Sequence, residues 1–244
     1  MNRINKVKII SIFIFLVPFI SINTCLILSQ IFPYGEVFAI GDAISENWRP
    51  WLIPYFDGAA SISRVTRVFP NYLIFKPAMF LTSCLLIIYW LNNKKIILSL
   101  IENHKYLKYI IFFGIGSAIA LIIHSIFLGI KFDNDLYKLF RRVILLTFII
   151  FEIVAQTYLV LILYSIKGKL NNLINPNILK LKMILVTCLI IVAIITIPFL
   201  ANNEHKILKH ALEWNYFLGV ITFYILTSLM WKKQKPHSHT FSGV

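Results

Sequence analysis

Six long runs of apolar residues divide the chain, and short segments that hold most of the charged residues separate them. Each run has the roughly 20 residues that a helix needs to cross the hydrocarbon core of a bilayer. A bilayer excludes lipid-exposed irregular backbone, so we expect helices, and the short alternating segments of a membrane β-barrel are absent. We therefore predict an all-α bundle of six transmembrane helices, one transmembrane domain over 1–244, with spans at about 9–32, 71–91, 109–130, 143–166, 183–200 and 214–231.

The first run follows three basic residues and has some features of a signal peptide. Its apolar stretch is longer than that of an ordinary signal peptide, and no small-residue cleavage site ends it. We therefore expect a retained membrane anchor.

The distribution of Lys and Arg predicts the orientation of the bundle. With both termini in the cytoplasm, the inner segments hold 14 Lys and Arg and the outer segments 9, while the outer segments hold eight of the ten acidic residues. Because cytoplasmic loops of membrane proteins carry an excess of Lys and Arg, this count favours an N-in, C-in topology. The segment 232–244 is then a short basic cytoplasmic tail, and 33–70 is a long structured first outer loop.

Composition agrees with this class of protein. Hydrophobic residues make up 59% of the chain and charged residues 14%, against about 45–50% and 25% in soluble domains. The net charge of +14 is therefore a consequence of topology, and we expect membrane lipids as partners and no nucleic acid. The three cysteines all fall in predicted spans, no motif indicates a cofactor or a metal, and we expect neither.

Glu152 lies near the middle of the fourth predicted span. A charged residue there costs roughly 2.5–3.5 kcal/mol. Glu152 is therefore either a functional group (a proton carrier, a general acid or base, or a partner for a cation) or a protonated acid that hydrogen-bonds another helix. His124 in the third span is an interhelical hydrogen-bond donor or a ligand-binding residue. Lys76, followed by Pro77, interrupts the second span and either extends towards the headgroups or pairs with Glu152.

The first outer loop combines aromatic residues with two arginines. Its aromatic side chains, among them Trp51 and Tyr55, suit the headgroup level of a membrane. Arg64 and Arg67 are three residues apart and share a helix face, so they are candidates to bind a lipid phosphate. The alternative is an interfacial element whose arginines are only solvated.

The third outer loop places His210 and Glu213 three residues apart, on one face of the helix that enters the membrane. A His–carboxylate pair can act as acid and base on a lipid ester or headgroup, and the alternative is the capping of a helix start. With Asp57 in the first loop, these residues belong to a set that falls in the outer half of the membrane or just above it: Asp57, Lys76, His124, Glu152, His210 and Glu213. This set predicts a polar cavity that opens to the outer side.

Two short segments resemble the DRAM-like family of six-helix membrane proteins. The sequence Pro54-Tyr55-Phe56-Asp57-Gly58 is similar to the Pro-Tyr-Ile-Ser-Asp motif in the first outer loop of that family, and Glu213-Trp214 is similar to the Glu-aromatic pair at the start of its last helix. The family includes autophagy modulators, factors for remodelling GPI-anchor lipids and adaptors of a phosphatidylinositol kinase. The resemblance implies handling of a lipid or a lipid-linked glycan, with Asp57, His210 and Glu213 as the site residues.

We therefore predict a protein that recognises or remodels a membrane lipid or lipid-linked glycan in an outward-facing polar cavity. Asp57, His210 and Glu213 are the candidate catalytic residues if it is an enzyme. The alternatives are a non-catalytic scaffold or adaptor and, third, a small proton-coupled transporter. The sequence is compatible with a bacterial inner membrane and with a eukaryotic endomembrane or plasma membrane. Candidate ligand-binding residues are Arg64, Arg67, Tyr55, Trp51, His124, Glu152 and Lys76.

Overall fold

The structure of the chain is a computed structural model that describes residues 3–32, 51–101, 104–130, 134–170, 173–201 and 205–232. Of these described residues 86% are helical, and none forms part of a named strand, which confirms the all-α prediction for this part of the chain. The helices are α1 (Arg3–Ile31), α2 (Pro54–Asp57), α3 (Ile62–Arg67), α4 (Asn71–Leu98), α5 (Leu107–Phe127), α6 (Asp135–Ser165), α7 (Lys167–Leu170), α8 (Pro176–Ala201) and α9 (Lys206–Met230).

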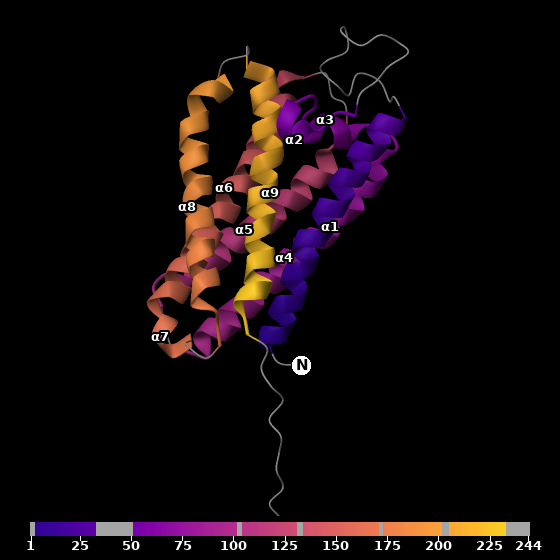
Figure 1. Ribbon diagram of the computed structural model, residues 1–244. Helices are drawn as coiled ribbons and strands as arrows, with labels where there is room; N and C mark the ends of the chain where they lie inside the picture. The colour runs from indigo at the N-terminus through magenta and orange to yellow at the C-terminus, as the bar shows by residue number, and fades with distance from the viewer. Residues whose placement is uncertain are drawn as a thin grey trace, which may run out of the picture.

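The long helices α1, α4, α5, α6, α8 and α9 run back and forth along one bundle (Figure 1). The short helices α2 and α3 lie at one end, here called the α2–α3 end, and α7 lies at the opposite end. The start of α1 and the end of α9 meet at that opposite end, where Lys8 Nζ donates a hydrogen bond of 2.7 Å to the carbonyl of Trp231.

Five of these helices are long and apolar enough to cross a membrane: α1, α4, α5, α6 and the stretch Pro176–Thr196 of α8. Their length and composition are compatible with a multi-pass membrane protein. The 25-residue helix α9 is not among the five. Its first turns carry charged and amide side chains, among them Lys206, Glu213 and Asn215, and its second half carries the buried hydroxyls of Thr227 and Ser228.

Three helices begin earlier than the predicted spans at 143, 183 and 214. Helix α6 starts at Asp135, where the Asn134 side chain accepts a 2.9 Å hydrogen bond from the Leu136 backbone N–H and caps the first turn. Helices α8 and α9 likewise include first turns that carry lysines. Hydropathy detects only the apolar part of a helix, so the charged turns that continue it were counted as loops.

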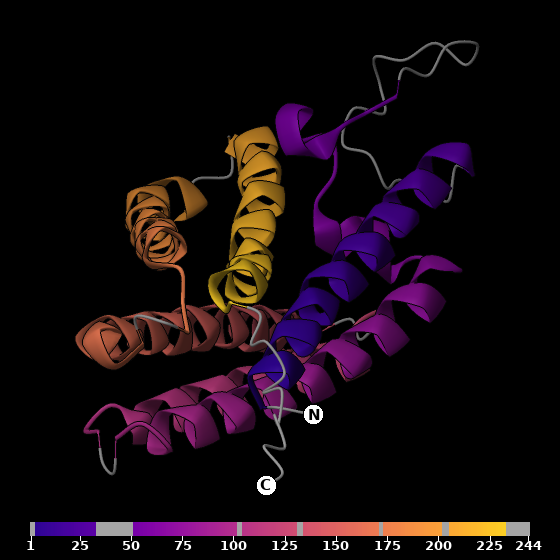
Figure 2. The same cartoon turned by 60° about the horizontal axis from the view of Figure 1, so that its bottom comes forward.

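Helix α6 lies between α5 on one side and α8 and α9 on the other (Figure 2). Helix α5 contacts α4 and α6, while α8 contacts α6 and α9, and α1 contacts α4 and α9. Figure 2 shows α5 and α6 side by side, with α8 and α9 on the other side of α6. Helix α5 approaches its neighbours through glycines, because Gly114 lies directly against the buried ring of Trp90 and Gly116 against the ring of Phe151.

Replacement of Gly114 by alanine should loosen the contact between α4 and α5. A Cβ at this position would lie 2.5 Å from the Trp90 ring, which is fully buried. We expect Gly114→Ala to destabilise the fold by about 1–3 kcal/mol, measured as a lower thermal unfolding midpoint of the purified protein in detergent. Gly168→Ala is the matched control, since a Cβ there meets no atom within 4 Å. Equal midpoints for the two variants would contradict this account of the packing.

Candidate functional site

The segment that contains α2 and α3 is fastened to α1 by two amide side chains. Gln30 bonds both backbone groups of Leu52, since its Nε2 donates to the carbonyl and its Oε1 accepts from the N–H, each at 2.9 Å. Asn71, at the start of α4, donates to Cys25 O at 3.0 Å and Ser29 Oγ at 2.7 Å on α1, and to the carbonyl of Val65 on α3 at 2.7 Å. These bonds hold an irregular segment in place at the α2–α3 end.

The start of α9 docks on the same segment from the other side. His210 Nδ1 donates to the carbonyl of Gly58 at 3.0 Å, and the indole N–H of Trp214 donates to the carbonyl of Ala60 at 2.8 Å. Gly58 has φ +59°, and a Cβ on it would overlap the carbonyl of Ile207 on α9. Glycine is therefore required at position 58 for two reasons: the left-handed backbone conformation and the close approach of α9.

Glu213 connects α9 to the first turn of α3. Its carboxylate accepts hydrogen bonds from the backbone N–H groups of Ile62 and Ser63, the first two residues of α3. Burial raises the pKa of Glu213 to about 7, and the two backbone hydrogen bonds oppose that rise. A carboxyl group with this pKa exchanges a proton near neutral pH.

Asp57 is engaged by its own loop. One carboxylate oxygen accepts from the backbone N–H of Ile53 at 2.6 Å, and the other accepts from that of Ala59 at 2.8 Å. This is the local pattern by which aspartate stabilises a turn.

The structure thus gathers the three candidate acid–base residues at the α2–α3 end, where the carbonyl bonded by His210 belongs to the residue after Asp57. Burial lowers the pKa of His210 most, and the positive charges of Arg64 and Lys206 lower it further, against the opposing effect of the bond to Gly58. The hydrogen bonds that the structure gives Asp57, His210 and Glu213 are to backbone groups.

The aromatic candidates lie at the same end and differ in exposure. Tyr55 packs edge-on against Trp214, with ring centroids 4.8 Å apart, and its hydroxyl donates to Asn23 Oδ1 on α1 at 3.2 Å. Trp51 and Phe56 are 67% and 85% exposed. Tyr55 therefore holds the segment together, whereas Trp51 and Phe56 point away from the protein.

Arg64 and Arg67 on α3 are joined by a third arginine, Arg141 on α6. Burial, followed by the like charges of Arg141 and Arg64, lowers the pKa of the Arg67 guanidinium, and no carboxylate of the described chain opposes this effect. The Nε of Arg141 is buried without a hydrogen-bond acceptor, while its guanidinium lies 6.0 Å from the ring centre of Tyr137. We call Arg64, Arg67 and Arg141 the arginine cluster.

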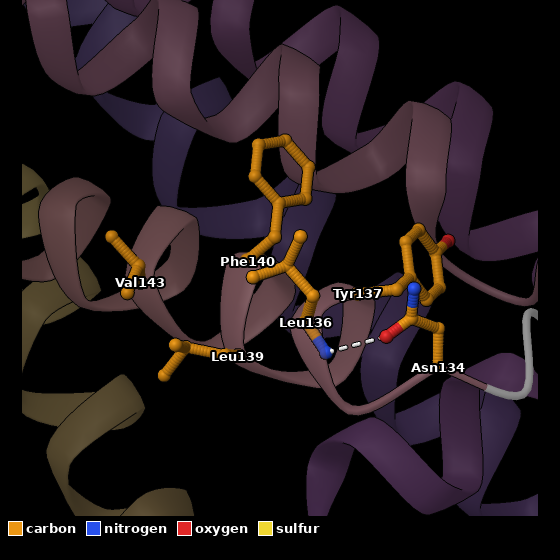
Figure 3. A pocket seen from close by; sticks show the side chains of 6 residues that line it. All are labelled: Asn134, Leu136, Tyr137, Leu139, Phe140 and Val143. Carbon is orange, nitrogen blue, oxygen red and sulfur yellow. Dashed lines mark hydrogen bonds between the residues drawn. The ribbon is translucent and has the colours of Figure 1, made fainter.

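An apolar groove lies on the first turns of α6, next to the arginine cluster. Its volume is about 620 Å³, and Figure 3 shows the side chains that line it. Tyr137 belongs to this groove, and the Arg141 guanidinium lies 6.0 Å from its ring centre, so groove and cluster are neighbours. The α6 groove, as we call it, is lined by Asn134, Leu136, Tyr137, Leu139, Phe140 and Val143.

Glu152 is buried in the interior, away from these groups. Its carboxyl oxygens are bonded by Ser117 Oγ on α5 at 2.7 Å, by Gln156 Nε2 on α6 at 3.0 Å and by the hydroxyl of Tyr224 on α9. The side chain is 1% exposed. Three helices therefore meet at this acid.

Neither His124 nor Lys76 forms a hydrogen bond to Glu152 among the bonds that the structure shows. Lys76 Nζ donates to the carbonyl of Ile126 at 3.2 Å and lies 5.7 Å from the ring centre of Tyr72, so the contacts of Lys76 are not with Glu152. His124 is 8% exposed, and its Nδ1 is buried without a partner.

Lys182 is a buried residue that hydropathy alone assigns to an inner loop, just before the predicted span at 183. The structure places it inside α8 with no exposed surface, where Nζ donates to Thr227 Oγ1 at 2.7 Å and lies 3.8 Å from the ring centre of Phe223. The helical period could have predicted its burial, because Lys182 shares a helix face with Leu179 and Val186, which are also buried. Arg141 was missed for a similar reason, since it was counted in the loop before α6.

Comparison of the chain with known protein families, with curated proteins and with solved structures finds no match.

The raised pKa of Glu213 predicts a pH dependence of stability. Between its ordinary value of 4.5 and about 7, the folded chain keeps a proton on Glu213 that the unfolded chain releases. The free energy of unfolding should therefore fall as pH rises through this window, by at most about 1.4 kcal/mol per pH unit. Glu213→Gln should reduce the slope in unfolding measurements between these pH values, whereas Asp135→Asn, at an exposed position, should keep it. An unchanged slope in Glu213→Gln would refute the assignment.

Proposed function

We propose that this chain is an integral membrane protein with six spans that binds a membrane lipid with a phosphate-bearing headgroup at its α2–α3 end. The arginine cluster is the observation that carries the proposal. The guanidinium of Arg67 is repelled by those of Arg64 and Arg141, and the Nε of Arg141 is buried without an acceptor. An anion with several oxygens would reduce the repulsion and accept a hydrogen bond from the buried Nε. Phosphate suits the planar donor geometry of arginine.

The α6 groove favours a lipid over a free anion. It is apolar, it adjoins the arginine cluster through Tyr137, and its residues Leu136 and Leu139 are exposed. A ligand with a charged head and an acyl chain fits both neighbours at once. The exposed rings of Trp51 and Phe56 at the same end suit the headgroup level, where aromatic side chains concentrate in membrane proteins.

The proposed topology takes α9 as the sixth span and places the α2–α3 end on the outer side. The direct contact of Lys8 with Trp231 supports an even number of crossings, because it brings the start of α1 and the end of α9 to one end. The excess of Lys and Arg in the segments at that end supports a cytoplasmic location.

Lipid remodelling is a second candidate function, and Glu213 favours it. A carboxyl group with a pKa of about 7 close to a histidine can transfer protons at neutral pH. Binding is the simpler proposal, since both oxygens of Asp57 and the carboxylate of Glu213 already bond backbone N–H groups. The resemblance to DRAM-like proteins implies handling of a lipid under either proposal.

Lipid binding is tested with two ligands that differ only in the phosphate. Native mass spectrometry of the detergent-purified full chain should show tighter binding of phosphatidic acid than of diacylglycerol with the same acyl chains. Arg67→Gln and Arg141→Gln should each weaken phosphatidic acid binding by about tenfold or more, because each removes charge-assisted hydrogen bonds. Arg142→Gln is the matched control, since Arg142 is an exposed arginine next to Arg141 and outside the cluster.

Equal binding of both lipids, or equal effects of Arg141→Gln and Arg142→Gln, would overturn the proposed site. In that case a scaffold or adaptor role would be favoured.

The proposed topology is tested by labelling single cysteines in a chain without Cys25, Cys84 and Cys188. A membrane-impermeant maleimide applied to sealed cells should label Ser63→Cys and leave Ser238→Cys unlabelled until the membrane is permeabilised. Labelling of both from the same side would rule out six spans.

A further inference from the structure

The hydrogen bonds around Glu152 have no role in the proposed lipid site, and they define a second site in the interior of the bundle. Ser117, Gln156 and Tyr224, which bond the Glu152 carboxyl group, are each at most 2% exposed. They come from α5, α6 and α9. A carboxyl group enclosed in this way takes its hydrogen bonds from the protein groups around it, and these groups therefore influence its protonation state.

A count of hydrogen atoms shows that the surrounding groups can satisfy a Glu152 that carries a proton. The Ser117 hydroxyl has one hydrogen and two acceptors within reach, the carbonyl of Gly114 at 2.9 Å and Glu152 Oε2 at 2.7 Å. If that hydrogen goes to Gly114, the contact between Ser117 and Glu152 needs a hydrogen from the acid. The other oxygen, Oε1, already accepts from Gln156 Nε2 and from the Tyr224 hydroxyl. All of these contacts are then satisfied by a neutral glutamic acid whose proton sits on Oε2.

We propose that Glu152, Ser117, Gln156 and Tyr224 form an exchangeable proton-binding site in the interior of the helix bundle.

The same side chains can also hold the ionised form, and this makes the proton exchangeable. When the proton leaves, the Ser117 hydroxyl can turn its hydrogen from the Gly114 carbonyl to Oε2. The carboxylate then accepts three hydrogen bonds, from Ser117, Gln156 and Tyr224. Burial opposes the charge, and hydrogen bonds to a charged oxygen are stronger than those to a neutral one. The site therefore changes state by the rotation of one hydroxyl group.

The surrounding helices present few titratable groups to this site. Tyr224 touches Glu152 directly, and Tyr89 on α4 packs edge-on against Tyr224 with ring centroids 5.0 Å apart. Lys182 on α8 bonds Thr227, which lies close to Tyr224 along α9. No other ionisable side chain of the described chain has a contact with Glu152 in this structure. The net charge of this site is therefore set mainly by whether Glu152 is protonated, and little by neighbouring ionisable groups.

Infrared spectroscopy of the full chain in lipid nanodiscs tests the protonation state directly, because protonated and ionised carboxyl groups absorb at different frequencies. At neutral pH, the wild-type spectrum minus that of Glu152→Gln should contain a protonated carboxyl band that shifts in D2O. Glu213→Gln is the control, since its loss must leave this band in place. Should Glu152→Gln fail to fold, Glu152→Asp keeps the acid and moves its band.

The exchange is tested by raising the pH until the protonated band gives way to carboxylate bands. Ser117→Ala should move the midpoint of this change upwards by about one pH unit, because the ionised form loses a stronger hydrogen bond than the neutral form. Ser125→Ala is the matched control, since Ser125 is also fully buried on α5 but bonds only the carbonyl of Leu121 on its own helix.

Three results would overturn the proposal. Carboxylate bands at neutral pH would show that Glu152 is ionised. A protonated band that never gives way, or never shifts in D2O, would show a purely structural acid. Equal midpoints for Ser117→Ala and Ser125→Ala would show that the serine is not the switch. None of these results depends on whether the arginine cluster binds a lipid.

Discussion

A polar side chain in an apolar environment must find its hydrogen-bond partner within the protein, and in this bundle α9 supplies partners along its length. At its start Trp214 and Glu213 hold the segment of α2 and α3. Further along, Tyr224 bonds Glu152 and Thr227 bonds Lys182. Helix α9 accordingly contacts more of the other helices than any other element does: α1, α2, α3, α6 and α8. The polar groups of α9 thus connect it to its neighbours from its start to near its end.

The two candidate sites obey opposite electrostatic rules. At the α2–α3 end, the charges of Arg64 and Arg141 act on the partly buried Arg67, and such like-charge repulsion would be reduced by a bound anion. In the interior, a single acid is enclosed by neutral donors, and burial favours the uncharged form. A negatively charged ligand would stabilise the arginine cluster, whereas a bound proton stabilises the buried Glu152. Both depend on α6, which carries Arg141 near its start and Glu152 near its middle.

Much of the helical framework could be predicted from hydropathy, and the site only in part. The apolar runs locate the long helices well, but they place the starts of α6 and α8 too late, because a helix continues through charged turns that hydropathy counts as loop. For the same reason Arg141 and Lys182 were assigned to loops. Arg64, Arg67, His210 and Glu213 were selected from residue type and spacing, and the structure places them at one end of the bundle.

The sequence by itself determined that the chain forms long apolar helices and how its basic residues divide between the connecting segments. These are local properties, set by composition and by the period of the helix. Only the tertiary structure decided which distant groups meet: Arg141 with Arg67, Glu213 with the first turn of α3, and Glu152 with Ser117 and Tyr224. Such pairings depend on how helices rotate and pack against one another. A carboxylate on an isolated helix could bond several different partners, and the packing of the neighbouring helices determines which partners it bonds.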